Sequence, residues 1–121
     1  MNDKTPTIMI VEDEVLVGIM LARKLRTKGF DVGEVLSTGE EAIERAEIEK
    51  PDVVLMDITL AGKIDGLEAA DTIQTDFNIP VIIFTGYDST TIKTKTTPVA
   101  ILSKMGPLED IIQAITTAVG D

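Results

Sequence analysis

The chain has 121 residues, of which 44% are hydrophobic and 26% charged, as expected for one globular domain with a proper core. It contains no cysteine and no histidine, which excludes disulfides, thiolate metal sites and histidine-based catalysis. The formal net charge of −10 disfavours binding to nucleic acid or to an anionic membrane, and favours binding to cations or basic protein surfaces.

The N-terminal segment is not expected to be a signal peptide. Residues 1–6 lack the basic start and the apolar core of a signal peptide, and no later run approaches the roughly 20 apolar residues that span a bilayer. Together with the absence of cysteine, this fits a cytoplasmic protein. No repeat, linker or low-complexity segment divides the chain, so residues 1–121 are expected to form one domain.

Strand-like and helix-like runs alternate in the first part of the chain. β-branched apolar residues predict two strands, the second nearer the sheet edge, and a period of 3.6 predicts two helices. In chain order, these elements are Thr7–Val11, Val15–Lys28, Asp31–Leu36 and Gly39–Glu49. Gly29 ends the first helix, and Ser37 or Thr38 caps the second. The first helix has an apolar stripe that includes Leu16 and Met20, of the kind that packs against a core.

The central run is Val53-Val54-Leu55-Met56-Asp57, in which four apolar residues end in an acid. Lys50-Pro51-Asp52 breaks the chain before this run. A short apolar run bounded by turn residues is typical of a strand that is buried on both faces. A loop leads to Asp65-Gly66, and apolar residues at steps of three or four then predict a third helix, which ends at Asn78-Ile79-Pro80.

The last third of the chain contains two more strand-like runs, Val81–Phe84 and Pro98–Ser103. The stretch between them, Asp88–Thr97, has one aliphatic residue and five threonines, so we expect it to be mobile or weakly helical. The final helix is expected to start near Pro107, since proline suits a first helical position.

Five strands that alternate with helices predict a single α/β domain with a doubly wound parallel sheet and right-handed crossovers. In such a sheet, ligands bind beyond the carboxyl ends of the strands. Polar residues follow four of these strands: Glu12 and Asp13, Asp57, Thr85, and Lys104. We therefore expect these side chains to share one edge of the sheet.

Several carboxylates at one edge need positive charge, since two unit charges 4 Å apart repel by about 4 kcal/mol at an effective dielectric of 20. Lys104 supplies one charge, and the all-oxygen ligand set favours Mg²⁺. Asp57 could then be a nucleophile towards phosphorus, with Lys104 and Thr85 holding phosphoryl oxygens. Each residue alone has an ordinary explanation, such as an acidic first helical turn for Glu12–Glu14. Their joint placement carries the prediction.

The sequence resembles the receiver domain of two-component response regulators over essentially its whole length. The motifs that carry the resemblance are Ile8–Asp13 with its acidic pair, Val54–Ile58, Asp65–Glu68, Thr85-Gly86 and Ser103-Lys104. The resemblance implies a CheY-like, flavodoxin-like fold with five helices and five strands in the order 2-1-3-4-5.

The resemblance also implies a function. A sensor histidine kinase or phosphotransfer protein would donate a phosphoryl group to Asp57, and a downstream effector that the sequence does not identify would respond. Lys104 would pair with Asp57 and then with the phosphoryl group, while Thr85 would move inward. The implied Mg²⁺ ligands are Asp13, Asp57 and the backbone carbonyl of Thr59, with Glu12 acting through water. Receivers often form homodimers, and no enzymatic action on an external substrate is expected.

Three positions depart from the family pattern. Met105 replaces the usual proline after the lysine, where a cis bond to a non-proline residue would cost roughly 2.5–4 kcal/mol. Ile101 occupies the position of an aromatic residue that turns inward on activation. The loop Ile58–Asp65 lacks a proline and is one residue longer. We therefore expect intact phosphorylation chemistry and a signal carried by Thr85 and the fourth helix without an aromatic flip.

Two other classes of function are alternatives. A receiver-like interaction module would bind partners without phosphorylation, although it would not need clustered charge. A flavin-binding protein or an aspartyl-phosphate hydrolase is the third class. Glu12–Glu14 would repel a flavin phosphate, and Thr59 stands where such a hydrolase needs a second acid.

Overall fold

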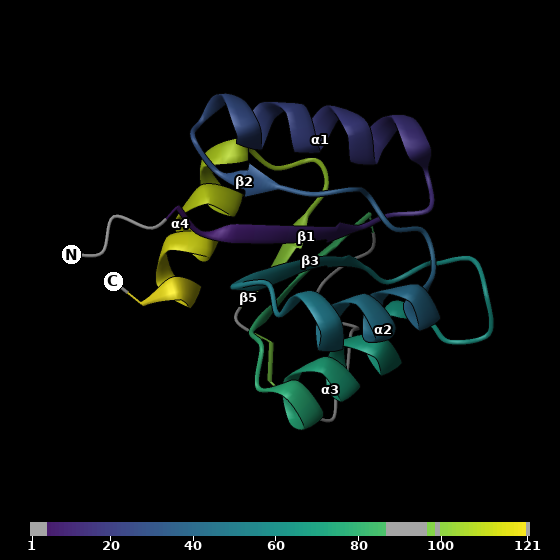
Figure 1. Cartoon of the computed structure of the whole chain (residues 1–121). Helices are drawn as coiled ribbons and strands as arrows, with labels where there is room; N and C mark the ends of the chain where they lie inside the picture. The colour runs from purple at the N-terminus through teal and green to yellow at the C-terminus, as the bar shows by residue number, and fades with distance from the viewer. Residues whose placement is uncertain (1–4, 87–96, 99, 121) are drawn as a thin grey trace.

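Five parallel strands form one sheet in the order β2-β1-β3-β4-β5 in the computed structural model of the chain, which describes residues 5–86, 97–98 and 100–120 (Figure 1). The strands are β1 (Thr7–Val11), β2 (Asp31–Val32), β3 (Val53–Asp57), β4 (Val81–Thr85) and β5 (Ala100–Ser103). The parallel sheet and its strand order confirm the predicted fold class.

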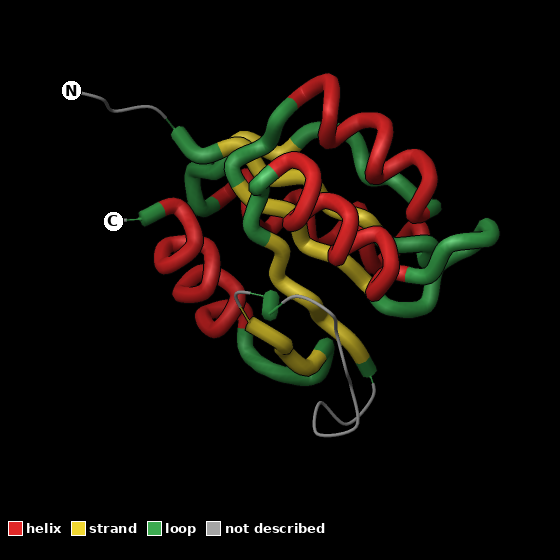
Figure 2. The backbone as a smooth tube through the Cα atoms, turned by 90° about the horizontal axis from the view of Figure 1, so that it is seen from below, coloured by secondary structure: helices red, strands yellow, loops and turns green. Residues whose placement is uncertain are grey.

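Helices cover both faces of the sheet (Figure 1). The described part of the chain contains α1 (Val15–Thr27), α2 (Gly39–Glu49), α3 (Gly66–Phe77) and α4 (Leu108–Val119). α1 and α4 lie on one face, and α2 and α3 on the other; in Figure 2 the strands pass between them. The weak helix expected within Asp88–Thr97 lies, apart from Thr97, outside the described residues, so the described helices number four.

β3 is the centre of the core. All five of its residues are buried, as a strand covered on both faces requires. Alternate side chains enter two apolar clusters: Val54 and Met56 pack under α2 and α3, while Val53 and Leu55 pack under α1 and α4. The apolar run that precedes Asp57 therefore fixes that residue at the middle of the sheet's carboxyl edge.

β2 is shorter than predicted. Of the expected strand Asp31–Leu36, only the first two residues form a strand. The guanidinium of Arg26 donates hydrogen bonds to the carbonyls of Val32 and Gly33, at 2.9–3.1 Å, so these carbonyls bind a side chain. The chain pairs with β1 again only at Leu36, through an isolated bridge to Val11.

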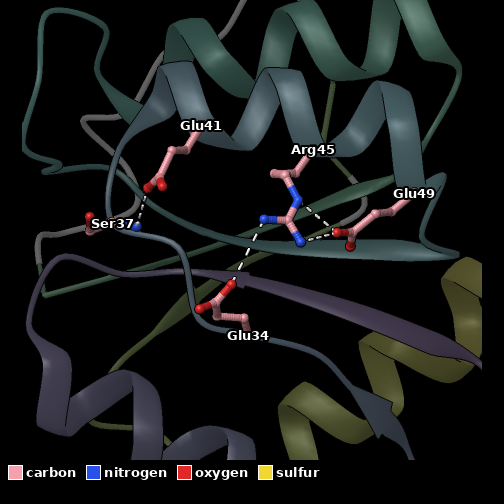
Figure 3. Close-up of polar contacts among 5 residues, drawn as sticks. All are labelled: Glu34, Ser37, Glu41, Arg45 and Glu49. Atoms are coloured by element: carbon pink, nitrogen blue, oxygen red, sulfur yellow. Dashed lines mark hydrogen bonds and ion pairs between the residues drawn. The ribbon is translucent and has the colours of Figure 1, made fainter.

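α2 is linked to the segment after β2 by polar side chains (Figure 3). Arg45 pairs with Glu49 one turn further along the helix, and its guanidinium lies 3.8 Å from Glu34. The Glu41 carboxylate lies on the same side and accepts the Ser37 backbone N–H at 3.4 Å. These exposed contacts orient α2 against the edge of the sheet without contributing much stability.

Local hydrogen bonds define where the helices begin. Thr38, one of the two predicted caps, accepts the Glu41 backbone N–H at 3.0 Å. Asp65 and Glu68 form a reciprocal capping box at the start of α3. Pro107 is the N-cap of α4, one residue before the first helical position, which was predicted for it from the sequence. Within the described ranges, no helix combines the length and the apolar character that crossing a bilayer requires.

Leu16, Ile19 and Met20, which the sequence places on one stripe of α1, do not pack against the core, whereas Leu21 and Leu25 beside them do. The buried side of this helix consists of Gly18, Ala22 and Leu25. Small residues on that side bring the helix close to the sheet and leave the stripe outside. The exposed residues form what we call the α1 apolar surface: Val15 (62% exposed), Leu16 (74%), Ile19 (43%) and Met20 (57%).

Candidate functional site

Three carboxylates meet at the carboxyl edge of the sheet. Val11 and Met56 are paired in register, so the residues that follow β1 lie beside Asp57, the last residue of β3. Oxygen atoms of Glu12, Asp13 and Asp57 all lie within 4.8 Å of one another. The structure therefore brings together the acids that the sequence placed at successive strand ends.

Lys104 lies among these acids. Its backbone N–H donates to the Thr85 carbonyl at 2.9 Å, which continues the pairing of β4 and β5 for one residue. Its Nζ lies 3.1 Å from Asp57 Oδ2, 2.8 Å from Glu12 Oε1 and 3.9 Å from Glu14 Oε1. One ammonium group thus faces three carboxylates, so the site keeps excess negative charge.

Burial changes the pKa values of Asp57 and Lys104. Desolvation is the main cause that raises the pKa of Asp57 from 3.8 to about 6; the Lys104 ammonium lowers this pKa, and the negative charge of Glu12 raises it. Burial by itself lowers the pKa of Lys104, but its contacts with Glu12 and Asp57 outweigh burial and raise it. The pKa values of both groups therefore depend on the net charge of the site.

Glu12 carries part of this charge in a buried position. Its Oε2 accepts the Glu14 backbone N–H at 3.0 Å, at the turn into α1. Its Oε1 is buried and lacks a well-aligned hydrogen bond, so the Lys104 ammonium compensates its charge. A buried carboxylate oxygen without an aligned donor is a group that a bound cation would satisfy.

Thr85 and Thr59 occupy different environments. Thr85 is 1% exposed at the end of β4, opposite Ser103 of β5 and directly beside the Lys104 backbone. Thr59 is exposed in the loop 58–65, two residues after Asp57. The assignment of its backbone carbonyl as a metal ligand stays a prediction.

Sequence reasoning assigned no role in the site to two neighbours. The Phe84 ring lies 5.4 Å from Lys104 Nζ, a cation–π distance. Gly66 packs so closely on the end of β3 that an added Cβ would lie 1.8 Å from the Asp57 carbonyl oxygen. The motif Asp65–Glu68 was the available signal, because a glycine directly after a helix cap indicates a close backbone approach.

The residues after Lys104 form a rebuilt turn. The Lys104–Met105 peptide bond is trans, and the Met105 and Gly106 backbone N–H groups donate to Ser103 Oγ at 3.0 Å and to the Ser103 carbonyl at 3.1 Å. Ile101 is partly buried against the cluster under α2 and α3. The turn holds Lys104 in the site without the proline of the family pattern.

The side chains at this edge of the sheet have the chemistry of a metal-assisted phosphoryl-transfer site. Their donors are carboxylate oxygens, with neither imidazole nor thiolate, and this set suits a hard cation such as Mg²⁺. A carboxylate beside an ammonium group and a metal can act as a nucleophile towards phosphorus. An open parallel sheet with this site at its carboxyl edge defines the class of phosphoacceptor signalling domains.

Comparisons with known proteins agree with this class. The family model for the response regulator receiver domain matches residues 8–116. The transcriptional regulatory protein PdtaR of Mycobacterium tuberculosis (strain CDC 1551 / Oshkosh) is 33% identical over 115 residues, which cover 93% of this chain and 56% of PdtaR. The signal receiver domain of a modulated diguanylate cyclase from Desulfovibrio desulfuricans G20 has a TM-score of 0.87 at 33% identity, covering 96% of this chain and 94% of that chain.

A third relative, the alkaline phosphatase synthesis transcriptional regulatory protein PhoP of Bacillus subtilis (strain 168), is 37% identical over 89 residues that cover 73% of this chain and 35% of PhoP. The chain belongs to the response regulator receiver domain family. Phosphorylation on an aspartate and Mg²⁺ binding at an acidic cluster are general features of this family, whose members act as signalling modules. The chain spans about half or less of the length of these two curated relatives.

Proposed function

We propose that residues 1–121 form one receiver unit in which Asp57 accepts a phosphoryl group from the phosphohistidine of a kinase or phosphotransfer protein. A carboxylate oxygen of Asp57 attacks phosphorus, the phosphorus–nitrogen bond breaks, and the imidazole nitrogen keeps the electron pair. Hydrolysis of the acyl phosphate later restores the carboxylate. The observation that carries this proposal is the Lys104 ammonium, 3.1 Å from Asp57 Oδ2 beside the acidic pair.

The other residues have supporting roles. Lys104, paired with Asp57, would transfer its ion pair to the phosphoryl oxygens, and the buried Thr85 would bond another of them. Mg²⁺, held by Glu12, Asp13, Asp57 and the Thr59 carbonyl, would neutralise charge on the phosphoryl oxygens. With Ile101 in place of an aromatic residue, the signal would pass through Thr85 and the chain that follows it.

Chemical phosphorylation tests the proposal directly. We expect the wild-type protein to gain one phosphoryl mass when it is incubated with acetyl phosphate and Mg²⁺, and to lose that mass in hydroxylamine, which cleaves acyl phosphates. Chelation of Mg²⁺ should suppress the reaction. Intact-mass spectrometry provides the measurement. A protein that remains unmodified and also fails to bind beryllofluoride would instead be a receiver-like interaction module.

The α1 apolar surface offers a docking face for the phosphodonor protein. Val15, Leu16, Ile19 and Met20 follow directly on the acidic residues of the site, so a partner on this surface would lie next to Asp57. Exposed apolar side chains that cluster in this way mark protein-binding surfaces. The acidic turn beside them would favour a partner with basic residues at its edge.

Leu16→Glu is expected to slow phosphotransfer from a phosphorylated partner protein by about 10-fold or more, because it places a charge in the contact, while acetyl phosphate still modifies Asp57 at the wild-type rate. Ile48→Glu is the matched control, since Ile48 is 70% exposed on α2, away from this surface. Transfer of radiolabelled phosphate measures both. Equal effects of the two substitutions would assign docking to another face.

A further inference from the structure

The loop 58–65, which carries Thr59, is held against the start of α2. The Glu40 carboxylate, in the first turn of that helix, accepts the Lys63 backbone N–H through Oε2 at 2.9 Å. Thr38, directly before the helix, forms a parallel bridge with Ala61. The loop is therefore joined to a helix 23 residues earlier in the sequence, on the side of the sheet that α2 and α3 cover.

The approach of loop and helix is close enough to constrain the sequence. Gly62 has φ of +95°, a conformation that side chains rarely adopt, and an added Cβ would lie 2.6 Å from Glu40 Oε1. The carboxylate thus lies over the backbone of the loop at Gly62 and Lys63. Its hydrogen bonds to the loop backbone, first of all to Lys63, lower the pKa of Glu40, so the group is ionised at neutral pH.

Other contacts hold the two ends of the loop. At the start, the Gly66 backbone N–H donates to the Ile58 carbonyl at 2.8 Å. At the end, the capping box of Asp65 and Glu68 holds the entry to α3. Between these ends, the loop meets α2 and its cap through the Thr38–Ala61 bridge, the Glu40 carboxylate and a close approach of Ile64 to Gly39. Of these contacts, the Glu40 carboxylate makes a side-chain hydrogen bond from an exposed position, so a substitution can remove it.

We propose that Glu40 is a positioning residue for the metal site: its carboxylate holds the loop so that the Thr59 carbonyl faces the Glu12–Asp13–Asp57 cluster. The inference rests on the proposed function. When a loop is already ordered before the cation binds, the entropy cost of ordering it does not reduce the binding free energy. Release of the loop therefore weakens metal binding and leaves the carboxylates and Lys104 unchanged.

The experiment compares Glu40→Ala with Glu41→Ala. Both substitutions remove one acid from the first turn of α2, so their effects on helix charge match. The Glu40 carboxylate accepts the Lys63 N–H of the loop, whereas the Glu41 carboxylate accepts the Ser37 N–H (Figure 3). Binding of Mn²⁺, followed by electron paramagnetic resonance, is expected to weaken about 10-fold in Glu40→Ala, at the low end of the loss for residues that orient metal ligands. Glu41→Ala should bind as the wild type does.

Two further variants separate positioning from general stability. Glu40→Gln keeps an oxygen that can accept the Lys63 N–H and is expected to restore binding. Glu40→Asp keeps the charge but withdraws the carboxylate by one methylene, and is expected to weaken binding as alanine does. Amide hydrogen exchange at Lys63 should accelerate in the alanine and aspartate variants only. Because aspartate is well tolerated in a first helical turn, this variant also serves if the alanine variant does not fold.

Phosphorylation kinetics complete the test. With acetyl phosphate, Glu40→Ala should need about 10-fold more Mg²⁺ for half-maximal rate and should reach the wild-type rate at saturation. If Glu40→Ala and Glu41→Ala bind Mn²⁺ with equal affinity, the inference about Glu40 is overturned. The proposed function would still stand in that case, provided that the wild-type protein is phosphorylated. A wild-type protein that neither binds Mn²⁺ nor accepts phosphate would overturn both.

Discussion

Asp57→Asn is expected to abolish phosphoryl acceptance, with no added mass after incubation with acetyl phosphate and Mg²⁺. The amide has almost the same shape as the carboxylate, but it lacks the anionic oxygen that attacks phosphorus. It also removes one of the three carboxylates that lie within 4.8 Å of one another, so Mg²⁺ should bind more weakly. Both effects act at the step that the proposed function requires, which makes this the largest expected change in activity.

Asp76→Asn is the matched control, because Asp76 is exposed on α3 and undergoes the same change of charge away from the carboxyl edge. It should be phosphorylated at the wild-type rate. Peptide mapping of the phosphorylated wild type should place the label on the peptide that contains Asp57. A label that persists in Asp57→Asn would move the acceptor to another residue, and Asp13 would be the next to test.

The sequence predicted β3 and the residues of the carboxyl edge for one physical reason, whereas the strand order was implied by the resemblance to the receiver family. Apolar runs that are buried on both faces form the strands of a parallel sheet. All strands of such a sheet run in the same direction, so the polar residue after each run must lie at the same edge. Asp57 and Lys104 are 47 residues apart and form an ion pair because β3 and β5 both run towards that edge. Here periodicity and topology were sufficient.

Where the prediction was wrong, a side chain decided the outcome. β2 ends early because Arg26 binds the carbonyls of Val32 and Gly33, and nothing in the alternation of Asp31–Leu36 indicates a competing guanidinium. Leu16 and Met20 have helical spacing, but Gly18 and Ala22 on the other side of α1 pack more closely against the sheet. Periodicity identifies the two sides of a helix; which side is buried depends on the shape of the surface that receives it.

Lys104→Met is expected to destabilise the fold by about 3 kcal/mol at pH 7.5 in the absence of Mg²⁺. Removal of one partner from a buried ion pair leaves uncompensated charge, which typically costs this much or more. Here it leaves Glu12 Oε1, which has no aligned hydrogen bond, and the Asp57 carboxylate facing each other. Lys28→Met, at the exposed end of α1, is the control and should change stability little.

The penalty should depend on pH in a defined direction. The pKa of Asp57 is about 6 in the folded protein and close to 3.9 in an unfolded chain, so between these values the folded state binds more protons. Stability from this group is therefore lost as pH rises towards 6. Without Lys104, which lowers this pKa, the loss extends to higher pH. Urea unfolding, followed by circular dichroism, should give a smaller difference between Lys104→Met and the wild type at pH 5 than at pH 7.5. A difference that stays constant with pH would mean that Lys104 stabilises the fold through packing and not through the Asp57 charge.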